Sequence, residues 1–152
     1  MINKKIAIIG LGYVGLPLAV AFSNYFKVVG FDNNKKRIGD LLNGLDITNE
    51  LSKPELKKLK KIKLTSDQKY LNSCNIYIVT VPTPIDKLKK FDLKYLISAS
   101  TIVGKYISKG DIVIYESTVY PGATEGDCVP ILEKYSGLKF NHDFFCGYSP
   151  ER

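Results

Sequence analysis

KIAIIGLGYVG, residues 5–15, passes from an apolar run directly into three spaced glycines. The run from Lys5 to Gly10 has the length and composition of a buried β-strand, and residues 13–25 have the pattern of a helix. Pro17 is acceptable in this helix because the N–H groups of a first helical turn have no partner within the helix. A strand, a tight turn and a helix in this order predict the first unit of a parallel α/β sheet.

Each glycine of this G-x-G-x-x-G pattern has a physical task. Gly10 permits the tight turn, Gly12 lets a pyrophosphate approach the backbone, and Gly15 lets the helix pack closely on the strand. The N–H groups at the start of the helix, around Tyr13 and Val14, and the positive end of its dipole would hold the phosphate charge. Glycines also occur in ordinary strand-to-helix turns, so the pattern gains its meaning from its surroundings.

An acidic residue stands where a dinucleotide-binding unit needs one. Asp32 comes twenty residues after Gly12 and ends the second predicted strand, where a carboxylate can accept hydrogen bonds from both adenosine ribose hydroxyls. A carboxylate also repels a 2′-phosphate, which favours NAD over NADP. Two alternatives remain open, since Asp32 is also a suitable N-cap for the next helix, and nearby cations could hold a 2′-phosphate. These cations are Lys35, Lys36 and Arg37.

The rest of the chain alternates between short apolar runs and helical patterns. Strands are predicted at 5–10, 27–32, 62–67, 75–82, 111–118 and 143–149, and helices at 13–25, 34–44, 53–61, 92–107 and 126–137. Strands joined by crossover helices predict one α/β domain over residues 1–152. Its fold would be a Rossmann-type, doubly wound, mainly parallel six-stranded sheet with helices on both faces. The polar excursion at 83–92 follows a strand end, where such sheets bind ligands.

Composition narrows the partners. The chain carries 22 Lys and Arg against 15 Asp and Glu, a net charge of +7, which suits an anionic ligand. Six lysines crowd residues 53–63 as a solvated helix face, and without a nucleic-acid module signature we expect no nucleic-acid partner. No apolar run approaches 18 residues, so we expect no membrane span. Cys74, Cys128 and Cys146 lack the spacing of a disulfide framework or a metal site and fit the core of a protein in a reducing cytoplasm.

Four stretches taken together resemble one family. They are GLGYVGLPLA at 10–19, VTVPTP at 79–84, ESTVYPGAT at 116–124 and GYSPER at 147–152. In this order the whole chain is similar to the NAD-binding half of a nucleotide-sugar dehydrogenase of the UDP-glucose/GDP-mannose dehydrogenase family. Within that family it looks most like the UDP-N-acetylhexosamine 6-dehydrogenases of bacterial surface-polysaccharide synthesis. The resemblance implies a UDP-sugar substrate and a homodimer for the full-length enzyme.

The resemblance also implies the chemistry. The sugar C6 alcohol is oxidised to a carboxylate with two NAD and two hydride transfers, while a cysteine holds the aldehyde-level intermediate and becomes a thioester that water hydrolyses. The residues that match the family's cofactor site are Gly10, Gly12, Tyr13, Val14, Gly15, Asp32, Arg37, Pro82, Thr83 and Thr118. Thr118 further matches the threonine that positions a water near the reacting carbon, and Glu151 the glutamate that supports attack by that water.

The family's catalytic cysteine and its assisting lysine and asparagine lie beyond position 152. We therefore expect this chain to be the N-terminal part of a longer enzyme, able to bind NAD but unable to oxidise a sugar by itself. Two alternatives remain, a stand-alone NAD-sensing module and the cofactor domain of a 3-hydroxyacid dehydrogenase. Thr118 and Glu151 distinguish the enzyme from the sensing module, because a sensor has no use for groups that position a water molecule. From the residues alone, Thr118 would also suit a serine/threonine turn or a helix N-cap, and Glu151 a plain surface position.

Overall fold

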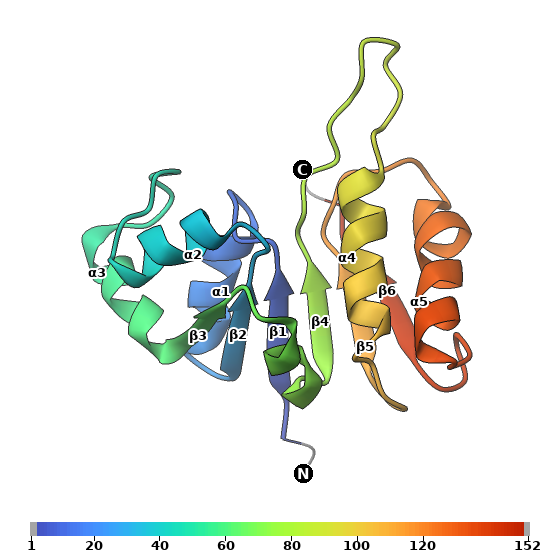
Figure 1. The fold of residues 1–152 in the computed structure, drawn as a ribbon, viewed down its shortest axis with the longest axis horizontal. Helices are drawn as coiled ribbons and strands as arrows, with labels where there is room; N and C mark the ends of the chain where they lie inside the picture. The colour runs from blue at the N-terminus through green and yellow to red at the C-terminus, as the bar shows by residue number, and fades with distance from the viewer. Residues whose placement is uncertain (1–2, 151–152) are drawn as a thin grey trace.

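The structure is a computed structural model that describes residues 3–150. Its centre is a six-stranded sheet in the order β3-β2-β1-β4-β5-β6, and every neighbouring pair runs parallel (Figure 1). This is the strand order of the doubly wound dinucleotide-binding fold, so the predicted fold is confirmed, with a sheet that is parallel throughout. The strands are β1 (Lys5–Ile9), β2 (Lys27–Phe31), β3 (Ile62–Thr65), β4 (Ile76–Val79), β5 (Ile112–Tyr115) and β6 (Phe145–Tyr148).

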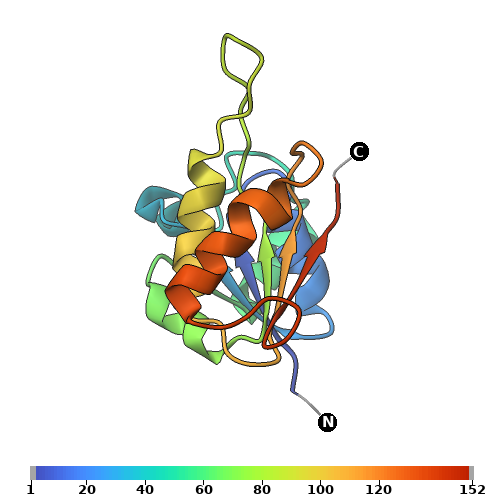
Figure 2. The same ribbon diagram turned by 90° about the vertical axis from the view of Figure 1, so that its right-hand side faces the viewer.

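Helices cover both faces of the sheet. In Figures 1 and 2, α4 and α5 pack side by side on one face, while α1 lies on the other. The helices are α1 (Gly15–Ser23), α2 (Lys35–Leu42), α3 (Lys53–Lys58), α4 (Lys94–Gly104) and α5 (Val129–Ser136). Shorter helical turns are η1 (Leu59–Lys61), η2 (Gln68–Ser73) and the π-helical turn η3 (Thr124–Cys128).

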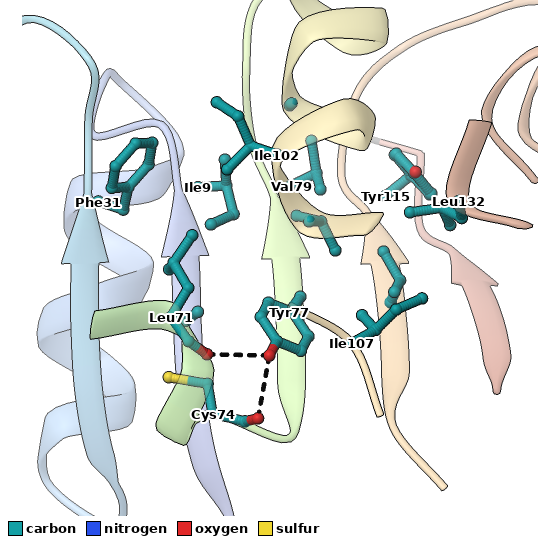
Figure 3. Close-up of a cluster of buried hydrophobic side chains, with 14 of the residues drawn as sticks. Ile9, Phe31, Leu71, Cys74, Tyr77, Val79, Ile102, Ile107, Tyr115 and Leu132 are labelled. Carbon is teal, nitrogen blue, oxygen red and sulfur yellow. Dashed lines mark hydrogen bonds between the residues drawn. The ribbon is translucent and has the colours of Figure 1, made fainter. Parts of the chain in front are cut away.

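The two faces follow from the alternation of side chains along each strand. In β1, Ile6 and Ile8 point into a core shared with α1 and α2, whereas Ala7 and Ile9 point into a larger core shared with α4 and α5. Figure 3 shows the larger core, where the Tyr77 hydroxyl ends among backbone carbonyls. Because β1 is buried on both faces, its sequence reads as a continuous apolar run.

Some predicted elements differ from the structure. The lysine-rich helix ends at Lys58 rather than at the predicted residue 61. Ser52 and Glu55 form the capping box at its start. Strand β4 ends at Val79 rather than Pro82, because its neighbour β1 ends at Ile9, whose carbonyl accepts from the Thr80 N–H at 2.9 Å. The turn η2 was not predicted. Cys74 and Cys128 are buried as expected, whereas Cys146 on the edge strand β6 is only half-buried.

The polar excursion after β4 is a hairpin. Ile85 and Phe91 form an antiparallel bridge, and the Asp86 N–H donates to the Lys90 carbonyl at 2.8 Å. This hairpin projects away from the body at the carboxyl end of the sheet (Figures 1 and 2). Lys89 at its tip has a φ of 59°, a left-handed conformation that a tight turn requires.

Candidate cofactor site

A cavity of about 610 Å³ opens at the carboxyl ends of β1 and β4. The strand order changes direction here, because the two neighbours of β1 in the sheet are β2 on one side and β4 on the other. Open α/β sheets bind their ligands at such a switch point, since the loops diverge there and leave a crevice. The cavity is lined by residues 9–14, 31–34, 80–83 and 116–118, and by Tyr95, Ser98, Ala99 and Ile102 of α4.

The glycine turn is built as the sequence predicts. Gly10 has a φ of +100°, which other residues rarely adopt, and its carbonyl accepts a hydrogen bond from Thr80 Oγ1 at 2.7 Å. A Cβ on Gly15 would lie only 1.8 Å from the Gly10 carbonyl oxygen, so α1 can approach β1 only with glycine there. A Cβ on Gly12 would meet no atom within 4 Å. The fold therefore requires Gly10 and Gly15, whereas Gly12 leaves open space beside the backbone for a ligand.

The first turn of α1 faces the same space. Tyr13 and Val14 precede the helix, and both line the cavity. The first N–H groups of a helix have no intrahelical acceptor and form, with the dipole, a site for a phosphate group. Tyr13 is 69% exposed, so it lies at the rim of the cavity rather than in the core. The N-terminus of α1 can therefore receive a diphosphate next to Gly12.

Asp32 lies at the end of β2, half-buried, with its carboxylate held in place by two backbone groups. Its Oδ2 accepts a hydrogen bond from the Leu11 N–H at 3.0 Å, and its Oδ1 accepts one from the Asn34 N–H at 2.9 Å. The N-cap of α2 is Asn34, whose side chain accepts from the Arg37 N–H. The alternative interpretation of Asp32 as that N-cap is thus wrong, and its carboxylate lines the cavity instead.

Arg37 is buried beneath the glycine turn, with its side chain only 7% exposed. Its Nε donates to the Leu11 carbonyl at 2.9 Å, its Nη1 to Asp46 Oδ1 at 3.1 Å, and its Nη2 to Thr48 Oγ1 at 3.3 Å. Asp32 and Arg37 therefore hold the two sides of the Leu11 residue, one at its N–H and the other at its carbonyl. The family resemblance implies that Asp32 and Arg37 together hold the adenosine ribose, and this stays a prediction.

Asp46 was not singled out from the sequence, where it appears as one acidic residue in a polar loop. In the structure it is 7% exposed and accepts hydrogen bonds from the Thr48, Glu50 and Leu51 N–H groups as well as from Arg37. Burial by itself would raise the pKa of the Asp46 carboxyl. The hydrogen bonds, chiefly from Thr48 and Leu51 and also from Arg37, outweigh burial and hold this pKa below its ordinary value.

A smaller hollow of about 220 Å³ adjoins the main cavity beside Asp32. It is lined by Lys36 and Asp40, which form an ion pair at 2.9 Å on the surface of α2, and by the exposed Ile47. The Lys36 ammonium is thus directed to Asp40. Lys35 is exposed and belongs to neither lining.

The far end of the cavity is formed by the loops after β4 and β5. Thr83 Oγ1 donates to the Thr118 carbonyl at 2.7 Å, and Ser117 Oγ donates to the Val81 carbonyl at 2.8 Å. These two bonds join the loops, so Pro82, Thr83 and Thr118 line one wall. The alternative that Thr118 caps a helix does not apply, because Ala123 occupies the N-cap of the next helical turn. Glu151 lies outside the described residues.

Sequence reasoning missed several lining residues. Glu116, half-buried at the end of β5, contributes to the cavity, and nothing in its local pattern distinguishes it from a surface glutamate. Tyr95, Ser98 and Ile102 lie on one face of α4. Their spacing of three and four is a helical period, but that period alone does not say whether the face meets a ligand or the core.

Within residues 3–150 no group of three or more His, Cys, Asp and Glu side chains is placed to hold a metal ion. Over the same residues, no helix is both long and apolar enough to span a bilayer. The polar groups of the site are therefore backbone N–H groups, hydroxyls and carboxylates. Such groups suit a dinucleotide, with phosphates at the start of α1 and ribose hydroxyls at Asp32.

Known proteins share this architecture. Residues 4–152 match the family model of the UDP-glucose/GDP-mannose dehydrogenase family, NAD binding domain. The UDP-N-acetyl-D-glucosamine 6-dehydrogenase of Pseudomonas aeruginosa is 59% identical over 152 residues, which are all of this chain and 36% of that protein. Protein CapL of Staphylococcus aureus is 57% identical over 150 residues, 99% of this chain and 35% of that protein.

Among solved structures, that of the UDP-D-ManNAc dehydrogenase from Pyrococcus horikoshii superposes with a TM-score of 0.87 at 35% identity. The superposition covers 98% of this chain and 36% of that one. The chain thus spans about a third of the length of these relatives. A family model over nearly the whole chain, together with the glycine turn, the acidic residue after β2 and the switch-point cavity, leads to one assignment. The chain belongs to the UDP-glucose/GDP-mannose dehydrogenase family, of which it forms the NAD-binding domain.

Proposed function

We propose that residues 1–152 are the N-terminal, cofactor-binding part of a UDP-sugar 6-dehydrogenase. The complete enzyme would oxidise the C6 alcohol of a UDP-N-acetylhexosamine to a carboxylate for surface-polysaccharide precursor synthesis. The observation that carries this proposal is that one cavity is lined by Gly12 and Asp32 at one end and by Thr83 and Thr118 at the other. Support for the substrate class comes from the 59% identical UDP-N-acetyl-D-glucosamine 6-dehydrogenase.

Two NAD molecules, bound in turn, would each accept one hydride, one in each of the two oxidations, and the chain's residues would hold each of them for that purpose. Gly12 leaves the backbone open to the pyrophosphate, while Gly10 and Gly15 allow the tight turn and the close approach of α1. Tyr13 and Val14 lie at the start of α1. The Asp32 carboxylate, already fixed by two N–H groups, has further lone pairs for the ribose hydroxyls. Pro82 and Thr83 would lie along the cofactor toward its nicotinamide end.

Thr118 and Glu151 are proposed as the catalytic residues of this half. The Thr118 carbonyl is bound by Thr83, which leaves its exposed hydroxyl to orient a water molecule, because a hydroxyl both donates and accepts. Glu151 would act as a general base that draws a proton from this water. The cysteine that would carry the thioester belongs to the substrate half, as do the contacts to the sugar.

The remaining partners follow from the same proposal. A UDP-sugar would be bound between this domain and the substrate half of the complete enzyme, and that enzyme would form a homodimer in the cytoplasm without a nucleic-acid partner. Free thiols at Cys74, Cys128 and Cys146 agree with a reducing compartment. The alternative of a 3-hydroxyacid dehydrogenase is not retained, because the family model matches residues 4–152.

The cofactor assignment is tested by titrating the 152-residue chain with NAD by calorimetry, beside the variants Gly12→Val and Gly126→Val. Both glycines have open space around them, so neither substitution should unfold the chain. Only Gly12→Val places a branched side chain where the pyrophosphate would lie, and we expect it to weaken binding by at least tenfold. Equal affinities of Gly12→Val and the unchanged chain would contradict the proposed site.

The catalytic assignment requires the complete enzyme. Thr118→Ala and Glu151→Gln should each slow turnover by two orders of magnitude or more, with near-normal NAD affinity, because they act on the water and not on cofactor binding. Ser149→Ala, in the same segment, serves as the control with little expected effect. Unchanged turnover in both variants would remove the catalytic roles of Thr118 and Glu151, whereas a complete protein without any turnover would favour the alternative of an NAD-sensing module.

A further inference from the structure

The buried ion pair between Arg37 and Asp46 lies directly behind the site expected to hold the adenosine ribose. Arg37 contacts the Leu11 carbonyl, and the Leu11 N–H contacts Asp32. Both side chains of the pair are almost fully buried, at 7% and 2% exposure. Arg37 also lines the small hollow beside Asp32. A change in the charge of this pair is therefore felt in the space next to Asp32, with little water between to screen it.

We infer that Asp46 is a specificity-determining residue that makes the site select NAD over NADP. Without Asp46, Arg37 would present an uncompensated positive charge behind the ribose, which would attract a 2′-phosphate. With Asp46 in place, that charge is neutralised and the guanidinium is tied to the loop at 46–48. This inference rests on the cofactor site and adds a residue that does not itself reach the cofactor.

Two ion pairs lie at the hollow beside Asp32. Lys36 is paired with Asp40 on the surface of α2, and Arg37 with Asp46 in the interior. Two pairs cancel, so the carboxylate of Asp32 is left as the unbalanced charge facing the ribose. This negative charge repels a 2′-phosphate and accepts hydrogen bonds from free hydroxyls. Selection of NAD therefore requires the carboxylate of Asp32 and also the neutralisation of the cation behind it.

Asp46 can hold its charge independently of Arg37. Its Oδ2 accepts from the Glu50 and Leu51 N–H groups at 2.9 and 3.2 Å, and its Oδ1 accepts from the Thr48 N–H at 3.0 Å. A carboxylate with several N–H donors stays ionised even when buried. Removing either partner thus leaves the charge of the other in place. The two single substitutions must therefore change the ratio of NADP to NAD affinity in opposite directions.

The test measures the ratio of NADP to NAD affinity for the 152-residue chain by calorimetry. Asp46→Asn should shift this ratio toward NADP by about tenfold, the order expected when one buried unit charge acts on a nearby phosphate with little water between them. Arg37→Gln should shift the ratio by about the same factor toward NAD. The double variant should return to the ratio of the unchanged chain, because the two charges then disappear together.

Partial unfolding cannot mimic this pattern, because it lowers both apparent affinities by the same fraction and leaves their ratio unchanged. Asp67→Asn is the matched control, since Asp67 caps η2 on the surface and pairs with Lys69, and its ratio should not move. Single variants that bind NAD with an unchanged ratio overturn the inference while the cofactor site stands. If Asp46→Asn does not fold, the ratio for Arg37→Gln alone decides. No binding of either cofactor to the unchanged chain would overturn the site itself.

Discussion

Replacement of Gly15 by alanine should damage this fold more than its small size suggests. The added Cβ would lie 1.8 Å from the Gly10 carbonyl oxygen, 2.5 Å from Thr80 Oγ1 and 2.9 Å from the Gly10 carbonyl carbon. Two of these atoms are backbone, so no side-chain rotation relieves the clash. The start of α1 would have to move away from β1 by about 1.5 Å to restore an ordinary contact, and well-packed interiors resist such shifts.

The magnitude follows from what this shift disturbs. Overpacking in a tight interior costs about 1–3 kcal/mol. The single Thr80 hydroxyl hydrogen lies within reach of the Gly10 and Ile9 carbonyls at 2.7 and 3.1 Å from Oγ1, and weakening this shared bond adds about 1 kcal/mol. We therefore expect the free energy of unfolding to fall by about 2–4 kcal/mol. For a chain of this size that corresponds to a fall in Tm of roughly 5–15 °C.

Thermal unfolding followed by circular dichroism measures this effect. Gly12→Ala is the matched control in the same turn, because its Cβ meets no atom within 4 Å, and it should leave the Tm nearly unchanged. Gly39→Ala, within α2 and equally open, should raise stability by about 0.5–1 kcal/mol through helix propensity. A Tm for Gly15→Ala within 2 °C of the unchanged chain would refute the close packing of α1 on the glycine turn.

Further predictions concern the interior polar groups. The Tyr77 hydroxyl lies within hydrogen-bond distance of the Leu71 and Cys74 carbonyls at 2.9 and 3.0 Å (Figure 3), so Tyr77→Phe should lower the free energy of unfolding by about 1–3 kcal/mol in urea titrations, and a loss below 0.3 kcal/mol would contradict this. Burial raises the pKa of the Cys74 thiol to about 11 and that of Cys146 to about 12. The folded state keeps these protons longer than the unfolded state, so the stabilisation is full below about pH 9 and is lost as pH rises through 11 to 12. The urea concentration at the unfolding midpoint should therefore decrease as the pH rises above 9, and it should decrease less in the Cys74→Ala/Cys146→Ala variant. An equal decrease in the variant and the unchanged chain would show that other groups cause it. Ser117→Ala removes the bond to the Val81 carbonyl. It should reduce the free energy of NAD binding more than the free energy of unfolding, as parallel calorimetry and thermal melts would show.

The sequence by itself determined the fold class and one end of the site. The apolar strand before Gly10 and the glycine spacing are local signals, because they report a turn and a helix packed on a strand within fifteen residues. The spacing to Asp32 extends the same unit by one strand, so its place at the cavity could also be predicted. The hairpin after β4 and the turn η2 were not predicted, since polar residues without a period do not specify a conformation.

Only the tertiary structure decided which polar residues meet. Arg37 appeared in the sequence as one of three neighbouring cations, yet it is buried against Asp46, whereas Lys36 pairs with Asp40 on the surface. Similarly, Tyr95 and Ser98 reach the cavity because α4 crosses the sheet at the switch point, a position that helical periodicity does not reveal. Local pattern specifies elements and turns, but side-chain partners depend on which loops the sheet order brings together, and that order is a property of the whole chain.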